Sequence, residues 1–310
     1  MKKKMPVISF IIPVYNSSPW IKEVVDSIFT QGYERENLEI ILIDDKSQDH
    51  SLAILEALQA EAANTIKLIK HEHNKGLSVA RNSGIKAAQG DIFVFLDSDI
   101  SLAPGFITET LRIFKNESIK GVVGKTFPAE EVNYDKFQKY LYEAPRGARH
   151  LESLSKVPYY YFLYNMASIR STVVQNTGLF DPDIKEYGGE DTEYAFRMAQ
   201  QFPEGLYFSP DLKGYHHHYR SLDDALQLYK IYGRVNVPYI IEKHPEMKSI
   251  YYYDYLQGPL HKRITGHIIK STIFRSFLIM LYNIIPGPLC FGIIRLLLAA
   301  AMLEGLDSRQ

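Results

Sequence analysis

Short apolar runs alternate with helical patterns over the first 125 residues of the chain. The runs are rich in β-branched residues, as buried strands are, and cover residues 7–12, 39–43, 65–70, 91–96 and 121–123. After the first run, apolar side chains recur at Ile21, Val24, Val25 and Ile28, which is the spacing of one helix face. Ser17 or Ser18 is the predicted cap of that helix. Helical patterns also follow the second, third and fourth runs.

Strands that alternate with helices predict an α/β fold with right-handed crossovers and a mainly parallel sheet flanked by helices. Three polar clusters follow predicted strands, namely Tyr15-Asn16, Asp44-Asp45 and Asp97-Ser98-Asp99. Ligands of such sheets bind beyond the carboxyl ends of the strands. The sequence therefore predicts that these three loops meet at one edge of the sheet and form a binding site.

The pattern changes after the first 125 residues. Periodicity weakens over residues 126–158, which favours an inserted segment on the acceptor side of the site. Gly188-Gly189-Glu190-Asp191 opens a predicted helix, and two short strands are expected near residues 206–208 and 214–218. Helical sequence follows Ser221.

These changes predict two parts of the chain. A first domain is expected at residues 1–225, with one half at 1–125, which contains the three polar clusters, and another at 126–225, which contains Glu190-Asp191. A helical extension, strongly apolar at 268–303, is expected at residues 226–310.

The composition narrows the class of partner. Lys and Arg total 35 against 36 Asp and Glu, so the basic excess of a general nucleic-acid binder is absent. Cys290 is the single cysteine, which rules out an intramolecular disulfide and a thiolate metal site and favours a reducing compartment. The 22 Tyr suit either a sugar-binding cleft or half-buried packing.

Asp97-Ser98-Asp99 is the central chemical motif. Alternate residues leaving a strand can direct two carboxylates toward one divalent ion, and oxygen ligands suit Mg²⁺ or Mn²⁺. Two carboxylates would repel a diphosphate unless a cation lay between them. The alternative is a solvated turn with no ligand.

Two further segments are candidates for nucleotide contacts. Asp44-Asp45 can accept hydrogen bonds from a base or a ribose, or it can serve only the cap of the next helix, through Ser47 or Asp49. The segment from Asn74 to Asn82 supplies a turn, a helix N-terminus and the guanidinium of Arg81, which suit a diphosphate or an ordinary surface helix.

Two acidic and basic clusters follow later in the chain. Glu190-Asp191 offers a general base, or simply an acidic helix start that favours the helix dipole. His216-His217-His218 ends a predicted strand, so at most the first and third imidazoles share a face. One of them can complete a metal site, and the alternative is a solvated run.

An ordered set of these motifs resembles the family-two glycosyltransferases with the GT-A fold. It consists of Pro13-Val14-Tyr15-Asn16, Ile43-Asp44-Asp45-Lys46-Ser47, Gly76-Leu77-Ser78-Val79-Ala80-Arg81-Asn82, Asp97-Ser98-Asp99, Gly189-Glu190-Asp191 and the histidine run. The resemblance covers residues 6–220 and implies transfer of a sugar from a nucleotide-sugar donor to an acceptor hydroxyl with inversion.

The resemblance also implies roles for single residues. Pro13, Tyr15 and Asp45 would contact the nucleoside, usually uridine, with Arg81 near the base or the diphosphate. In the acidic motif, Asp97 would face the ribose or metal-bound water beside Ser98, and Asp99 would be the main ligand of Mn²⁺ or Mg²⁺.

The same resemblance implies the remaining site residues. His216 aligns best as a further metal contact, with its two neighbours as alternatives, and Asp191 would be the catalytic base.

One departure from the family pattern concerns polymerisation. Processive members carry Gln-x-x-Arg-Trp after the base, whereas the single tryptophan here is Trp20. We therefore expect addition of one hexosyl or N-acetylhexosaminyl unit, usually from a UDP-sugar, in polysaccharide or lipid-linked glycan synthesis.

Two rival functions remain at this stage. A protein that binds nucleotide-sugars without turnover is disfavoured by the presence of both Asp99 and Asp191. A sugar nucleotidyltransferase is disfavoured because Pro13-Val14-Tyr15-Asn16 does not supply a glycine-rich, arginine-containing loop after the first strand. A dehydrogenase is disfavoured because no G-x-G-x-x-G follows that strand.

Apolar segments near the two ends of the chain indicate where in the cell the protein is expected. Met1-Lys2-Lys3-Lys4 followed by an apolar run superficially resembles a signal peptide, but the run is short and broken by Pro13, which favours a first strand. Residues 277–294 carry no charge yet contain Pro286 and Pro288, which interrupt a straight span. We expect a cytoplasmic protein with peripheral contact to the inner membrane face through residues 268–303, a true span and a helical cap or dimer surface being the alternatives.

Overall fold

The computed structural model describes residues 5–129 and 135–308. The lysines at positions 2–4 and residues 130–134 of the weakly periodic segment lie outside this description. The described residues form two compact units. Unit 1 comprises Met1–Glu130, Pro145–Asp183 and Glu190–His218, and unit 2 comprises Glu131–Ala144, Ile184–Gly189 and Tyr219–Gln310. The domain boundary predicted after residue 225 stays a prediction.

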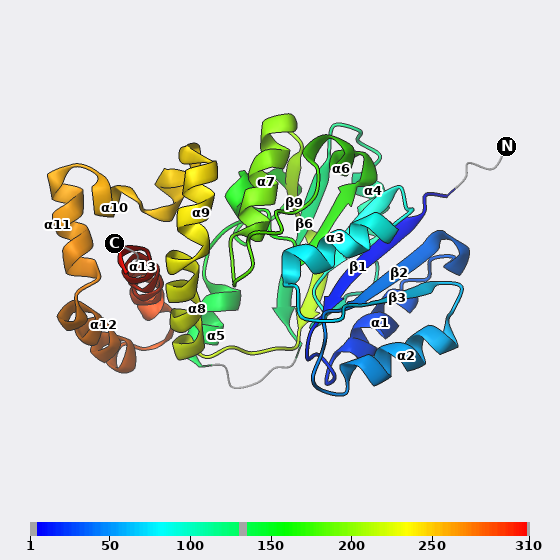
Figure 1. The fold of residues 1–310 in the computed structure, drawn as a ribbon, viewed down its shortest axis with the longest axis horizontal. Coiled ribbons are helices and arrows are strands. Elements are labelled where there is room, and N and C mark those ends of the chain that lie inside the picture. The colour runs from blue at the N-terminus through cyan, green and yellow to red at the C-terminus, as the bar shows by residue number, and fades with distance from the viewer. Residues whose placement is uncertain (1–4, 130–134, 309–310) are drawn as a thin grey trace. The chain divides into compact units, whose positions relative to one another are not determined.

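Unit 1 is built on one mixed sheet with the strand order β3-β2-β1-β4-β8-β6-β9-β5, and β7 pairs with β9 (Figure 1). Its strands are β1 (Ile8–Val14), β2 (Leu38–Asp44), β3 (Ile66–Lys70), β4 (Ile92–Leu96), β5 (Ile100–Leu102), β6 (Gly121–Pro128), β7 (Ser155–Lys156), β8 (Met166–Arg170) and β9 (Leu206–His216). The first four strands in this order are parallel to one another, so their carboxyl ends share one edge.

Alternation along the central strands fills two apolar layers, one on each face of the sheet. Phe10 and Ile12 of β1 belong to the layer covered by α1 (Ile21–Phe29), α2 (Ser51–Glu61) and α4 (Phe106–Ile113). Ile11 belongs to the other layer, covered by α3 (Leu77–Ala87), α6 (Ser171–Thr177) and α7 (Glu190–Gln201). Burial on both faces explains why these strands read as continuous apolar runs. The predicted α/β sheet flanked by helices is confirmed.

The second half of the sheet differs from the sequence prediction. The strand β8 lies antiparallel between β4 and β6, and neither β8 nor the three-residue β5 was predicted. The two strands expected near residues 206–208 and 214–218 are one strand, β9. A run of five residues that includes Ser168 inside the sheet gives little period-two signal, which explains the omission of β8.

The helix starts also differ in detail from the predicted caps. The backbone carbonyl of Ser17, and not its hydroxyl, accepts the N–H groups of Trp20 and Ile21. Asp49 accepts from the backbone N–H of Ser51 at 2.9 Å and from that of Ser18 at 3.0 Å. Asp49 thereby joins the loops that follow β1 and β2.

Unit 2 is helical. It contains α5 (Lys136–Glu143), α8 (Leu222–Arg234), α9 (Asn236–Lys243), α10 (Asp254–Gln257), α11 (Leu260–Ile269), α12 (Thr272–Ile284) and α13 (Phe291–Asp307), with 3-10 turns η3 (Pro245–Tyr251) and η4 (Gly287–Cys290). The apolar C-terminal helical extension predicted from the sequence is confirmed.

The most apolar helical segment of the described chain, Gly287–Asp307, has a mean hydropathy of 2.0 and is long enough to cross a membrane. The consecutive helices α11 and α12 pass the same test of length and composition only as a pair, and they are bent by 59° at their junction. Length and composition also fit the core helix of a folded protein, and 56% of the first segment is buried.

Candidate active site

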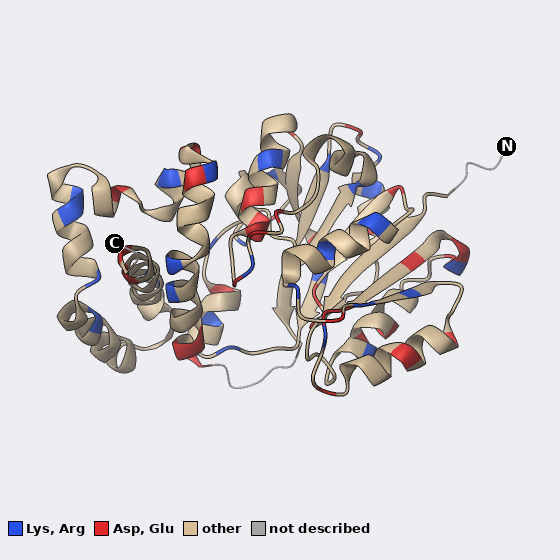
Figure 2. Cartoon of the chain, in the orientation of Figure 1, with Lys and Arg blue, Asp and Glu red and all other residues tan. Residues whose placement is uncertain are grey.

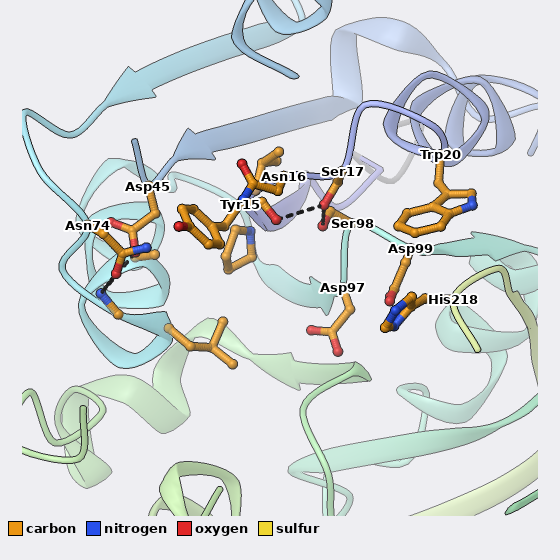
Figure 3. Close-up of a pocket in the computed structure, with 15 residues that line it drawn as sticks. Tyr15, Asn16, Ser17, Trp20, Asp45, Asn74, Asp97, Ser98, Asp99 and His218 are labelled. Carbon is orange, nitrogen blue, oxygen red and sulfur yellow. Dashed lines mark hydrogen bonds between the residues drawn. The ribbon is translucent and has the colours of Figure 1, made fainter. Parts of the chain in front are cut away.

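A cavity of about 460 Å³ lies in unit 1 beyond the carboxyl ends of β1, β2 and β4. Its lining comes from the three predicted loops, the start of α3 and the histidine run: Pro13, Val14, Tyr15, Asn16, Ser17, Trp20, Asp45, Asn74, Gly76, Leu77, Ala80, Asp97, Ser98, Asp99 and His218. In Figure 3, Asp45 and Asn74 mark one end of the cavity, Trp20 and His218 the other, and Asp97 lies between them. The structure therefore brings together loops that are far apart in the sequence.

The loop after β1 is held by the loop after β2. Asn16, at φ 53°, accepts from the backbone N–H of Gln48 at 2.7 Å, and its own N–H donates to the hydroxyl of Ser47. Tyr15 next to it makes the cavity wall and remains 45% exposed. The hydrogen bonds of Asn16 hold the backbone next to Tyr15, and the Tyr15 ring is exposed to the cavity. Such a ring can stack against a planar base.

Asp45 is buried and uses both carboxylate oxygens to organise a neighbouring loop. One oxygen accepts from the backbone N–H of Lys75 at 2.9 Å and lies 2.6 Å from Nδ1 of His71. The other accepts from the N–H of Gly76 at 2.9 Å. Gly76 has φ 86°, so this turn favours glycine, and it leads directly into α3. Asp45 thus fixes the wall beside the cavity, and its direct contact with a nucleoside stays a prediction.

The acidic motif Asp97-Ser98-Asp99 follows β4 and lines the cavity. Ser98 shares a hydrogen bond with Ser17, with 2.6 Å between their hydroxyl oxygens. Oδ2 of Asp99 lies 3.2 Å from Nε2 of His216. Burial raises the pKa of Asp99, but the hydrogen bond from His216 and the charges of His216 and His218 outweigh burial and lower it.

The histidine run divides as strand alternation predicts. His217 donates its backbone N–H to the carbonyl of Asp99, and its ring pairs with the hydroxyl of Ser101 at 2.9 Å. His218 lines the cavity and faces the ring of Trp20, with 5.4 Å between ring centroids. The first and third imidazoles are therefore the ones directed to Asp99 and the cavity.

The donor atoms at this end fit a metal ion that arrives with a ligand. Within residues 5–129 and 135–308, no three His, Cys, Asp or Glu side chains are grouped closely enough to hold an ion by themselves. Asp99 and His216 together offer one carboxylate and one imidazole. Mg²⁺ and Mn²⁺ sites with few protein ligands are usually completed by phosphate oxygens and water, so the residues fit an ion shared with a diphosphate.

Arg81 lies behind the cavity wall and not on it. The side chain is 1% exposed, with Nη1 2.6 Å from Oδ1 of Asp191 and 3.5 Å from Oε1 of Glu190. Its Nη2 lies 3.5 Å from Oδ1 of Asp97, and the guanidinium packs 5.2 Å from the centre of the Phe180 ring. One buried cation therefore faces three carboxylates. The predicted proximity of Arg81 to a base or diphosphate stays a prediction.

The excess of carboxylates over cations, together with burial, affects the pKa values of two of these carboxyl groups. Burial raises the pKa of Asp97 to about 7, with the charge of Arg81 opposing the shift and those of Asp99 and Asp191 adding to it. Burial and the charge of Asp191 raise the pKa of Glu190 to about 7 as well, again against the effect of Arg81.

Asp191 is held on both sides at the start of α7. One oxygen pairs with Arg81, and the other accepts from the backbone N–H of Tyr164 at 3.0 Å. Its side chain is 16% exposed. A carboxylate fixed in orientation and still open to solvent can accept a proton from a bound hydroxyl.

Several residues of this constellation were not singled out from the sequence. Glu190 was singled out only together with Asp191, His71 is an isolated histidine, and Tyr164 acts through its backbone N–H. Trp20 was noted only because it is not part of a Gln-x-x-Arg-Trp motif. A backbone donor leaves no signal in side-chain identity, whereas the isolated aromatic and histidine side chains carry a signal too weak to interpret alone.

Glu190→Gln is expected to stabilise unit 1 in neutral and alkaline solution. The pKa of Glu190 in the folded protein, about 7, exceeds the ordinary value of 4.5. The folded state therefore binds the extra proton and loses stability as the pH rises between these values. The variant keeps Arg81, Asp97 and Asp191 but has no Glu190 carboxyl group to ionise. Its stability should therefore not fall in this way as the pH rises.

Urea unfolding followed by Trp20 fluorescence measures the effect. The advantage of the variant over the natural chain should be about 3 kcal/mol larger above about pH 7 than below about pH 4.5. A difference that does not change with pH would contradict the burial of an uncompensated Glu190 carboxylate.

The chain is similar in sequence to known glycosyltransferases. Residues 9–177 match the model of Glycosyl transferase family 2, which is more than half of the chain. An uncharacterised glycosyltransferase of Bacillus subtilis, YfnE, is 25% identical over 85% of this chain and 77% of its own length. The poly(ribitol-phosphate) beta-glucosyltransferase of Bacillus spizizenii is 35% identical over 39% of this chain, a match that spans only 20% of that protein.

Solved structures support the fold. The mannosyltransferase PcManGT of Pyrobaculum calidifontis, solved with GDP-Man and Mn²⁺, aligns with a TM-score of 0.58 at 16% identity, covering 98% of this chain and 88% of that one. S. aureus TarS 1-349 in complex with UDP-GlcNAc aligns with a TM-score of 0.54 at 17% identity, covering 97% and 91%. The predicted GT-A-like α/β fold is thereby confirmed, and the match of the family model over residues 9–177 shows that the chain belongs to Glycosyl transferase family 2.

Proposed function

We propose that the chain transfers one hexosyl or N-acetylhexosaminyl unit from a UDP-sugar to an acceptor hydroxyl, with inversion and with Mn²⁺ or Mg²⁺. The proposal rests on a series of contacts in unit 1 that connects the cavity to Asp191. Asp97 lines the cavity and lies 3.5 Å from Arg81, which in turn pairs with Asp191 at 2.6 Å. A donor cavity and a candidate base are therefore joined through one buried guanidinium.

The nucleoside would occupy the end of the cavity between Tyr15 and Asp45. Tyr15 offers a ring face, and the turn that Asp45 fixes offers backbone groups at the start of α3. Pro13 also lines the cavity. Rigid donors and an exposed ring are the features by which proteins hold a base with little cost in ordering.

The diphosphate would lie toward Asp97, Ser98 and Asp99. Asp99 and His216 would hold the ion, and His218 is the nearest alternative imidazole. When bound, the ion would neutralise negative charge on the leaving diphosphate. The lowered pKa of Asp99 keeps this ligand ionised at neutral pH, which suits binding to a cation.

Asp191 would take the proton of the acceptor hydroxyl while the hydroxyl oxygen attacks the anomeric carbon of the donor sugar. The bond from that carbon to the diphosphate breaks at the same time. Arg81 and the N–H of Tyr164 fix the two oxygens, so the carboxylate cannot turn away from the acceptor. Preorganisation of this kind avoids reorientation during the reaction. Water need not enter, because the acceptor supplies both the nucleophile and the proton.

The acceptor is proposed to be a glycan or a lipid-linked glycan of a polysaccharide pathway. A relative of this chain acts on poly(ribitol-phosphate), as its name states, which supports a polymeric acceptor. Residues 1–225 would carry the catalysis and residues 226–310 would form the extension. A cytoplasmic place at the inner face of the membrane fits this acceptor class.

Asp99→Ala is expected to lower sugar-nucleotide turnover by about a hundredfold or more, because the ion loses its main protein ligand. The measurement is release of UDP or GDP from UDP-GlcNAc, UDP-glucose and GDP-mannose, with Mn²⁺, with Mg²⁺ and with chelator. Asp26→Ala is the control, since Asp26 is half exposed and pairs with Lys22 on the surface of α1. Equal rates for natural chain and Asp99→Ala would overturn the proposed metal site.

A further inference from the structure

The apolar helices of unit 2 have two different environments. In α13, Ile294, Leu297 and Leu303 are at most 1% exposed. A Cβ atom placed on Gly305 would fall 2.0 Å from the carbonyl oxygen of Lys230 in α8, so the two helix backbones are in close contact. The helix that best fits a membrane span by composition is therefore the interior of unit 2, which leaves α11 and α12 as its outer helices.

The outer helices carry exposed apolar stripes at helical spacing. On α12, Ile273, Phe277, Met280 and Ile284 recur at intervals of four, three and four residues and are 48–85% exposed. On α11, Leu260, Ile264 and Ile268 recur every four residues and are 52–70% exposed. Helices of globular proteins usually present polar side chains to solvent, whereas α11 and α12 present a row of apolar side chains.

The same segment is basic. No Asp or Glu occurs between Asp254 and Glu304, while that interval contains five cationic residues, namely Lys262, Arg263, Lys270, Arg275 and Arg295. In Figure 2, Lys and Arg colour α11 and α12, and no acidic residue does. An apolar stripe on a basic helix pair is typical of segments that lie on an anionic lipid surface.

Ion pairs show which sides of α11 and α12 face the protein. Lys262 pairs with Asp254 at 2.8 Å, and Arg275 pairs with Glu304 of α13 at 2.8 Å. Lys270 at the junction pairs with Asp307. A transmembrane hairpin would bring these pairs into hydrocarbon, whereas a hairpin lying in the plane of the interface immerses only its stripe.

We propose that the stripe of α11 and α12, residues 260–284, docks unit 2 on an anionic lipid surface. The membrane contact expected at 268–303 is thereby moved to the outer helix pair and away from α13. A second copy of the chain fits the stripe less well, because residues 260–284 contain no Asp or Glu and a two-fold contact would set their cations against one another. The acidic residues that pair with Lys262, Lys270 and Arg275 lie outside this stretch. The proposal is independent of the donor site.

The test is flotation of the full chain with vesicles of phosphatidylcholine alone or with three parts in ten of phosphatidylglycerol. The natural chain should float with the mixed vesicles and much less with the neutral ones. Ile273→Ser with Ile284→Ser should weaken binding by more than about tenfold, because two apolar side chains no longer enter the lipid. These side chains are 85% and 70% exposed, so the fold should tolerate the change.

Val235→Ser with Tyr252→Ser is the matched control, since both residues are exposed, apolar and in unit 2 but outside the stripe. The control should bind like the natural chain, and Arg263→Glu should bind mixed vesicles less. Absence of vesicle binding by the natural chain, or equal binding by the stripe variant, would overturn the proposal. Loss of self-association in the stripe variant without any vesicle binding would assign the stripe to a second copy instead. UDP binding, measured alongside, reports on the donor site separately.

Discussion

Asp191→Asn should reduce sugar transfer by about three orders of magnitude while leaving donor binding nearly unchanged. The asparagine oxygen can still accept from the N–H of Tyr164, and Arg81 keeps Asp97 and Glu190 as partners, so the local fold should persist. Its amide cannot accept the proton of the acceptor hydroxyl at neutral pH. The measurement is kcat for transfer, together with the Kd for UDP, in the natural chain and the variant.

Glu190→Gln is the matched control for this loss. Glu190 adjoins Asp191 and also faces Arg81, but at 3.5 Å and not 2.6 Å. If Asp191 is the base, transfer should fall far less in the Glu190 variant than in the Asp191 variant. The reverse order would assign the proton transfer to Glu190, and near-normal turnover in both variants would place the base elsewhere.

Arg81→Met should destabilise unit 1 by about 3–5 kcal/mol at about pH 8, because a buried cation is removed while its carboxylates remain. The loss should be smaller at about pH 5, where Asp97 and Glu190, with pKa values raised to about 7, hold protons. Urea unfolding followed by the fluorescence of Trp20, which lies in the same unit, measures both values.

Arg112→Met serves as the comparison for a surface arginine. Arg112 pairs with Glu109 through two hydrogen bonds of 2.6 Å, but its side chain is 56% exposed. Its loss should cost far less stability than the loss of Arg81, because exposed ion pairs contribute little. A similarly small cost for Arg81→Met at alkaline pH would show that the buried cluster is not held together by its guanidinium.

Much of the donor half follows from the sequence because it depends on local patterns. The apolar runs that form β1, β2 and β4 are buried on both faces, and the polar residues that follow them line one cavity. Alternation also places His217, which follows the end of β9, away from the imidazoles beside Asp99. In each case the physical cause acts within a few residues of the chain.

The remaining features depend on contacts between distant residues. Arg81 and Asp191 are separated by 110 positions and meet only because α3 and α7 cover the same face of the sheet. The strand β8 pairs with strands on either side that precede it by tens of residues. The apolar tail likewise reads as one segment, whereas its packing buries α13 and exposes α11 and α12.

The most direct test of the central claim uses the single tryptophan, which lines the cavity next to His218. UDP is titrated into the natural chain and into Asp99→Ala, with Mn²⁺ and with chelator, and Trp20 fluorescence is recorded. We expect a saturable fluorescence change with Mn²⁺, and we expect chelator or Asp99→Ala to weaken the apparent affinity for UDP by about tenfold or more. A folded chain whose fluorescence does not respond to UDP, or responds equally with chelator, would contradict a metal-dependent UDP-sugar site.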